Sequence, residues 1–154
     1  MKLKVLWVGK TQEEWLRRGI DEYSGRIRRY APLEIAEARE EKGAAAEAMR
    51  ARECERLEKL VPRNARLVLL DERGDQMTSP QLAAFIAKCR DSAVPEMAFA
   101  IGGAYGFADS FRARADKLLS LSPLTFTHQM ARVILLEQLY RAHTIINGEP
   151  YHHP

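Results

Sequence analysis

Short apolar runs alternate with longer helical stretches from one end of the chain to the other. The predicted strands, rich in aliphatic and β-branched side chains, cover residues 3–8, 33–38, 66–71, 97–101 and 118–121. The predicted helices cover residues 13–30, 40–60 and 109–117, and two more begin at Ser79 and His128. Such alternation predicts an α/β fold, with a mostly parallel sheet and helices on both faces. Because no repeat or linker interrupts the pattern, residues 1–154 are expected to form a single domain.

The loops that follow the predicted strands are where a ligand site is expected. The carboxyl ends of parallel strands meet at one edge of a sheet, so residues 70–74, 102–107 and 122–127 should converge there. We expect residues 72–78 to form a polar loop before the helix that Ser79 caps.

Composition narrows the class of protein only slightly. Apolar residues make up 46% and charged residues 29%, which is an ordinary mixture for a globular protein. The net charge of +3 arises within residues 1–64, where 15 Lys and Arg face 12 Asp and Glu. A basic excess of this size permits a nucleic-acid partner but does not require one.

Location and metal content can also be anticipated. No apolar run approaches the roughly 18–20 residues of a membrane span, and the first ten residues predict a strand in place of a signal peptide. Cys54 and Cys89 lie in helical patterns without a Cys-x-x-Cys motif, so reduced, buried thiols in a cytoplasmic protein are expected. The adjacent side chains of His152 and His153 diverge and lack a third ligand, so we expect no metal site. Because no apolar run is long enough, we also expect no membrane partner.

Arginines recur along the first predicted helix. Arg17 and Arg28 are eleven residues apart, as are Arg18 and Arg29, and eleven residues are close to three helical turns. Two rows therefore flank the apolar stripe. They could contact RNA phosphates, or they could form a solvated face that pairs with neighbouring glutamates.

Residues 101–107, with the sequence IGGAYGF, place three glycines directly after a predicted strand. Glycine allows a tight turn and lets a ligand approach the backbone closely. The spacing is not that of a dinucleotide-binding G-x-G-x-x-G motif. A small-molecule site and a purely structural turn both remain open.

Residues 121–142 join a strand to a helix that is apolar almost all the way round. A polar turn at this junction offers backbone N–H groups to a ligand. His128 and Arg132 lie four residues apart on one face, and Glu137 and Arg141 lie four apart on roughly the opposite face. One pair could face a site while the other braces it, or both could be ordinary surface pairs on a core helix. A second subunit is expected to cover part of this helix.

Three segments carry a resemblance to a known family that extends over essentially the whole chain. They are residues 101–107, residues 128–142 (HQMARVILLEQLYRA) and the ending Pro150-Tyr151-His152-His153. They resemble the SPOUT-class methyltransferases that modify N3 of a pseudouridine in helix 69 of bacterial 23S ribosomal RNA. The resemblance implies a trefoil knot near the C-terminus, a homodimer, and action on assembled ribosomes.

The resemblance also implies that bent S-adenosyl-L-methionine is held in the knot, largely by backbone groups. Carried over by motif, its contacts are Leu70, Gly103, Ser122, Pro123, Leu124, Thr125, Phe126 and Thr127. This chain has Thr127 where the family usually has proline, which is expected to loosen the turn before His128.

Roles for the polar residues follow from the implied reaction. The imide N3 of pseudouridine is a poor nucleophile while it carries its proton. We expect His128 and Arg132 to surround the target base, with Tyr151 and His152 supplied by the tail of the other subunit. Arg17, Arg18, Arg28, Arg29 and Arg141 are then candidates for RNA binding. The competing interpretations are a non-catalytic RNA-binding protein and an enzyme of the same fold that modifies another RNA.

Overall fold

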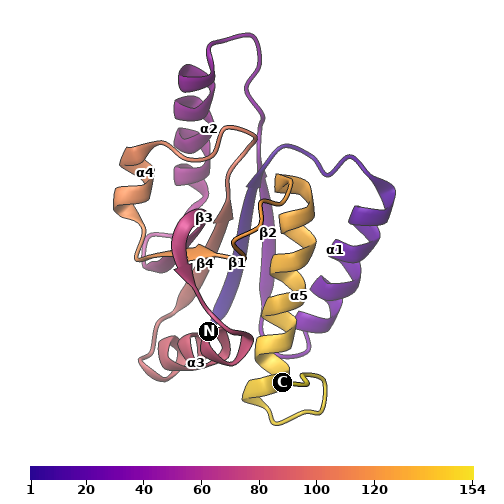
Figure 1. Cartoon of the computed structure of the whole chain (residues 1–154). Helices are drawn as coiled ribbons and strands as arrows, with labels where there is room; N and C mark the ends of the chain where they lie inside the picture. Colours follow the sequence, from indigo (N-terminus) through magenta and orange to yellow (C-terminus); the bar gives the residue numbers. More distant parts are fainter.

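The computed structural model describes all residues from 1 to 154 and contains one five-stranded sheet, as Figure 1 shows. The strands are β1 (Lys2–Val8), β2 (Leu33–Ala38), β3 (Ala65–Gln76), β4 (Glu96–Ile101) and β5 (Lys117–Ser120). Their order in the sheet is β2-β1-β4-β3-β5, and every neighbouring pair is parallel. The predicted α/β fold with a mostly parallel sheet is therefore confirmed.

Five helices cover the two faces of the sheet (Figure 1). They are α1 (Glu14–Ile27), α2 (Ala46–Leu60), α3 (Ser79–Asp91), α4 (Asp109–Arg114) and α5 (His128–Ile146). One core cluster joins the sheet to α1, α3 and α5, and a second joins it to α2 and α4. No helix combines the length and the apolar character needed to cross a bilayer.

Strand β1 shows how the sequence builds both cores. Alternate side chains of a strand point to opposite faces, so Val5 and Trp7 enter the first cluster while Leu6 and Val8 enter the second. Its neighbour β4 is buried along nearly its whole length. Central parallel strands read as continuous apolar runs because helices cover both faces.

Strand β3 is longer than its apolar run predicts. Residues 72–76, expected as a loop, continue the strand and pair with β5 after a register shift between Leu70 and Asp75. At Gly74 the two strands are so close that a Cβ would lie 2.5 Å from the carbonyl carbon of Leu118. The polar sequence hides this extension, because its stability comes from a partner strand and not from burial.

Four predicted helix boundaries differ from the structure. The helix expected from residue 40 begins at Ala46, after Gly43 adopts a φ of +77°. The short helix α4 ends at Arg114, because Lys117 already belongs to β5. The cap of α3 is Thr78 in place of Ser79, and its hydroxyl accepts a hydrogen bond from the Gln81 amide. The first helix ends at Ile27, three residues earlier than expected.

Helix α5 is covered on two sides by its own chain. It packs against α1 and α3 as well as the sheet, and Gly19 of α1 leaves room for Val133, which would be 3.2 Å from a Cβ at that position. The helix has no fully exposed residue. Its outward side, which includes Met130, Ile134 and Glu137, is half-buried.

Candidate functional site

A cavity of about 580 Å³ lies at the carboxyl edge of the sheet, where residues 70–73 of β3 meet the loops after β4 and β5. Its walls come from residues 70–73, 101–104, 106–107, 119–122 and 124–128, with Arg112 and Ala131 completing the lining. The volume is in the range of small-molecule and cofactor sites. The three segments converge as predicted, although the first of them belongs to β3 and is not a loop.

Most of the residues carried over for cofactor binding line this cavity. They are Leu70, Gly103, Ser122, Leu124, Thr125, Phe126 and Thr127, whereas Pro123 is not among the lining residues. Leu124 is 71% exposed and Phe126 is 36% exposed. Exposed apolar side chains beside a cavity offer a surface on which a planar ring can pack.

The loop before α5 is ordered by its own hydroxyl groups. Ser122 accepts a hydrogen bond from the Leu124 amide at 3.0 Å, and its carbonyl accepts one from the Ser120 hydroxyl at 3.1 Å. Thr127 is the N-cap of α5, and its hydroxyl accepts a hydrogen bond from the Met130 amide at 3.1 Å. Its φ of −60° is also one that proline adopts. Thr127 therefore keeps a proline-like backbone and adds a cap.

The glycine turn at residues 102–106 has both of the properties that the sequence left open: it is a tight structural turn, and it lines the cavity. A Cβ at Gly102 would lie 3.1 Å from the backbone of Gly106, and a Cβ at Gly103 would lie 2.7 Å from Oε1 of Glu53. The Gly106 amide donates to the Gly103 carbonyl at 3.0 Å, which closes the turn. Because both glycines also line the cavity, the turn presents bare backbone to a ligand.

Glu53 supports this turn from α2 and was missed by sequence reasoning. Its side chain is buried, and Oε2 accepts a hydrogen bond from the Glu41 amide at 3.1 Å, while Oε1 has no partner. Burial raises the pKa of Glu53. A glutamate in an Ala- and Arg-rich helix looks like a surface residue, so the sequence carries no signal for its position.

His128 lies at the first position of α5 and lines the cavity. Burial, followed by the positive charge of Arg132, lowers the pKa of His128, and Glu40 opposes this change. The imidazole is therefore neutral at pH 7 and has a nitrogen that can accept a proton.

Arg132 does not line the cavity, because it is fully buried one turn further along α5. Its guanidinium donates to the Thr11 hydroxyl at 2.8 Å and to the Val8 carbonyl at 2.6 Å, and it lies 4.9 Å from the Trp7 ring centroid. No carboxylate forms an ion pair with it, and burial lowers its pKa to about 10. Arg132 therefore holds the loop after β1 and influences the site through its charge on His128.

Two of the arginines considered for RNA binding contact their own chain. Arg17 donates to Glu14 at 3.0 and 3.2 Å and to the Thr11 carbonyl at 2.8 Å. Arg28 donates to the Leu33 carbonyl at 3.3 Å. These contacts favour a structural role for Arg17 and Arg28 over contact with RNA phosphates, in agreement with the alternative that the rows pair with their own chain.

Arg18 and Arg29, the other two arginines of the rows, make fewer contacts with their own chain. Arg18 is exposed and its contact is a 3.5 Å ion pair with the exposed Glu14. Arg29 is exposed and its side chain forms no ion pair. Neither residue lines the cavity, so any contact with RNA would occur on a separate surface.

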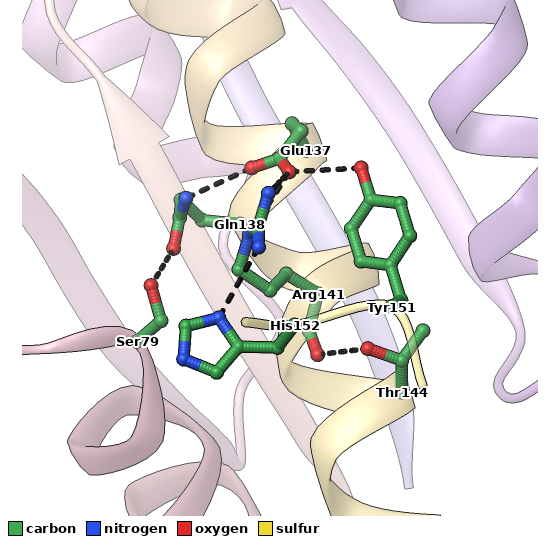
Figure 2. A network of polar contacts seen from close by, with 7 residues as sticks. All are labelled: Ser79, Glu137, Gln138, Arg141, Thr144, Tyr151 and His152. Atoms are coloured by element: carbon green, nitrogen blue, oxygen red, sulfur yellow. Dashed lines mark hydrogen bonds and ion pairs between the residues drawn. The ribbon is translucent and has the colours of Figure 1, made fainter. Parts of the chain in front are cut away.

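The C-terminal tail folds back onto α5 through a polar network (Figure 2). Glu137 accepts hydrogen bonds from Arg141 at 2.6 and 3.0 Å and from the Tyr151 hydroxyl at 3.0 Å. Arg141 also lies 3.2 Å from Nδ1 of His152 and 4.7 Å from the Tyr151 ring centroid. Of the two alternatives for Arg141, these contacts favour bracing of Glu137 and the tail, while RNA binding by Arg141 stays a prediction.

The same network reaches α3. Gln138 donates to Glu137 at 2.8 Å and accepts a hydrogen bond from the Ser79 hydroxyl at 2.6 Å (Figure 2). The network runs along α5 from Glu137, in the middle of the helix, toward its C-terminal end, whereas His128 begins the helix. A helix rises about 1.5 Å per residue, so Glu137, which binds the Tyr151 hydroxyl, lies roughly 14 Å along α5 from His128. Neither Tyr151 nor His152 lines the cavity of its own chain.

No three His, Cys, Asp or Glu side chains come together in a way that could hold a metal ion. Cys54 and Cys89 are buried free thiols, as expected.

The fold and the cavity together define a parallel α/β protein with a cavity of small-molecule size at the carboxyl edge of its sheet. The family model described as "Predicted SPOUT methyltransferase" matches residues 1–152. The chain therefore belongs to the SPOUT methyltransferase family, which confirms the resemblance seen in its sequence.

Named relatives cover the full length of the chain. It is 89% identical to the ribosomal RNA large subunit methyltransferase H of Geobacter metallireducens, over 99% of both chains. It is 79% identical to the protein of the same name from Geobacter sulfurreducens, over 99% of this chain and all of that one. Among solved structures, a probable methylase family protein from Haemophilus influenzae shares the fold, with a TM-score of 0.56 and 10% identity over 99% of this chain and 70% of that one.

Proposed function

We propose that this protein uses S-adenosyl-L-methionine to methylate N3 of a pseudouridine in helix 69 of 23S ribosomal RNA. It acts in the cytoplasm, as a homodimer, on assembled ribosomes. The observation that carries the proposal is the cavity lined by seven of the eight residues that the family resemblance assigns to the cofactor. The names of its relatives support large-subunit ribosomal RNA as the substrate. The knot stays a prediction from the resemblance.

The residues present fit this cofactor. Leu70, Leu124 and Phe126 provide apolar walls for an adenine ring, and the backbone of Gly103 and its turn is open for polar contacts. When bound, S-adenosyl-L-methionine supplies an electrophilic methyl group on its sulfonium centre. The protein must then orient the acceptor nitrogen and remove its proton.

His128 is the candidate for proton removal. It lines the cavity, and its neutral imidazole can accept the proton of an imide nitrogen. Arg132 is too deeply buried to touch a base, so we now assign it a positioning role. Its cation helps to keep His128 unprotonated, and its hydrogen bonds fix the neighbouring loop.

The contacts of the tail with its own chain support a dimer. Tyr151 and His152 are held by Glu137 and Arg141 and do not line the cavity of their own chain, whereas a second subunit could bring its tail to a base in that cavity. The half-buried outward side of α5, with Met130 and Ile134, provides an apolar surface on which that subunit could pack.

A methyl-transfer assay tests the proposal. Labelled S-adenosyl-L-methionine is incubated with assembled ribosomes that lack the helix 69 methyl group, and with separate large subunits, and the product is mapped by mass spectrometry. Methyl on the helix 69 pseudouridine of ribosomes is the expected result. Cofactor binding without transfer would indicate another RNA substrate, and absence of cofactor binding would favour a non-catalytic RNA-binding protein.

A further inference from the structure

Arg112 is a cavity residue that neither the sequence patterns nor the family resemblance singled out. It comes from the short helix α4 and lines the cavity together with Asp71, which lies in the extended strand β3. The side chain of Arg112 is 21% exposed, whereas that of Arg73, the other cavity arginine, is 69% exposed. Arg112 is therefore the more enclosed of the two guanidinium groups.

A buried carboxylate fixes the orientation of this guanidinium. Nε of Arg112 donates to Oδ2 of Asp71, whose side chain is 6% exposed, and Oδ1 of Asp71 accepts the Arg73 amide at 2.9 Å. Burial alone would raise the pKa of Asp71, but the hydrogen bonds from Arg112 and the Arg73 amide hold it below its usual value. Asp71 therefore remains ionised and keeps the Nε–H of Arg112, the inner edge of the guanidinium, hydrogen-bonded.

The outer edge of the Arg112 guanidinium, formed by Nη1 and Nη2, is available to a ligand. Nη2 has no hydrogen-bond partner, and it lies 3.9 Å from where a Cβ of Gly106 would be, so the glycine leaves it uncovered. Nη1 donates to Asp109 at 2.9 Å, but the Asp109 side chain is 99% exposed. Ion pairs with a fully hydrated partner are weak, so a ligand anion can replace Asp109.

We propose that Arg112 binds the α-carboxylate of S-adenosyl-L-methionine through Nη1 and Nη2, with Asp71 as the positioning residue. Two parallel N–H donors match the two oxygens of a carboxylate, which is the geometry that distinguishes arginine from lysine. The glycine turn then lies beneath the amino-acid end of the cofactor, and the apolar walls remain for its adenosine. This inference rests on the proposed cofactor.

Two ligands that differ in a single group test the inference. Calorimetry would compare S-adenosyl-L-methionine with its decarboxylated form, on the wild-type protein and on Arg112→Gln. Charge-assisted hydrogen bonds are strong, so Arg112→Gln should weaken binding of S-adenosyl-L-methionine about tenfold or more. Its affinity for the decarboxylated form should change by less than about twofold, because that ligand never used the guanidinium.

Two further variants make the test specific. Arg114→Gln changes an arginine of the same helix that pairs with Glu58 at 3.0 Å and does not line the cavity, so both affinities should remain unchanged. Arg112→Lys retains a charge without the paired donors and should give an intermediate loss. It also provides the comparison if Arg112→Gln fails to fold.

Each other outcome has a distinct meaning. An equal loss for both ligands would overturn the inference, because Arg112 would then only brace the cavity wall. Unchanged affinities combined with weaker ribosome binding would assign the outer edge to RNA phosphate and would also overturn it. If the wild-type protein bound neither ligand, the proposed function itself would fail.

Discussion

At the scale of single residues, Arg132 is an arginine that lies in the core without a carboxylate. Its partners are the Thr11 hydroxyl, the Val8 carbonyl and the Trp7 ring, and its Nε and the Trp7 indole N–H have no partners. Burying a charge is costly unless hydrogen bonds compensate for lost hydration. The arrangement places a cation beside the site and fixes the loop that follows β1.

Replacing Arg132 should therefore destabilise the fold. Arg132→Met leaves the Val8 carbonyl and the Thr11 hydroxyl without their donor, and we expect a loss of about 2–4 kcal/mol in the free energy of unfolding. Urea denaturation measures this loss. Arg18→Met, at an exposed position, should change it by less than about 0.5 kcal/mol. An Arg132→Met protein as stable as the wild type would show that the core does not depend on this guanidinium.

His143 should make stability depend on pH near neutrality. Its Nδ1–H donates to the Leu139 carbonyl at 2.7 Å and its ring stacks on Tyr30, and burial lowers its pKa. In the unfolded chain a histidine titrates near its usual value of about 6.5, so the unfolded state binds the proton more readily. His143 therefore causes stability to fall as the pH drops below about 6.5.

The prediction is that His143→Gln flattens this dependence. Between about pH 7 and pH 5, its urea midpoint should decline less steeply than that of the wild-type protein. Histidine chemical shifts in a two-dimensional spectrum would locate the titration independently. Parallel pH curves for the two proteins would show that His143 does not titrate differently in the folded state.

At the scale of secondary-structure elements, β3 and the paired strand β5 lie very close together at Gly74. Of all the glycines in the chain, Gly74 leaves the least room for a Cβ. Gly74→Ala would place a methyl group 2.5 Å from the Leu118 carbonyl carbon. Because the obstacle is backbone in a paired strand, we expect a loss of about 2–3 kcal/mol in the free energy of unfolding.

Gly25→Ala provides the matched control. Gly25 lies in α1, and a Cβ there would meet nothing within 4 Å. Alanine favours helix over glycine, so this change should raise the free energy of unfolding by about 0.5–1 kcal/mol. Both variants are compared by urea denaturation. Equal effects of the two changes would mean that β3 and β5 can separate at Gly74 without cost.

The elements also show how much of the fold could be predicted from the sequence. Apolar runs located all five strands, and the rule that parallel strands end at one edge located the cavity, since neither depends on distant contacts. The periodicity of α5 correctly put His128 and Arg132 on one side. It could not show that the helix begins beyond the sheet edge, so that His128 faces the cavity while Arg132 lies over Trp7.

The remaining site residues had no local signal. Asp71 and Arg112 are 41 residues apart in the chain, and Glu53 comes from α2, which packs with α4 on the face of the sheet opposite α5. Only the strand order brings them together. Charged residues in helices and after strands look alike in sequence, whether they contact solvent or a ligand.

At the scale of the whole molecule, the proposed dimer would divide each catalytic site between two chains. His128→Ala removes the cavity side of a site, and Tyr151→Ala removes the tail side, so each variant alone should transfer little methyl. In a mixed dimer, one of the two sites would keep an intact His128 and an intact Tyr151. Coexpression of the two variants should therefore restore about a quarter of wild-type activity.

Differently tagged chains allow the mixed dimer to be purified and its activity assigned. The control is coexpression of two His128→Ala chains, which should remain inactive. A mixed dimer no more active than either variant alone would mean that the tail does not complete the site of its partner. Light scattering that showed an active monomer would exclude the dimer altogether.

The strand order has a consequence for biosynthesis. Apart from β1 with β2 and β3 with β4, no strand pairs with its immediate predecessor in sequence, and the two pairs are joined only through β4, which begins at Glu96. A ribosome delivers the chain from the N-terminus, so every strand pairing except that of β1 with β2 waits until well over half of the protein has been made. The walls of the cavity extend from Leu70 to Ala131, so the last wall emerges only with the start of α5. A nascent chain that ends before α5 therefore lacks part of the cavity.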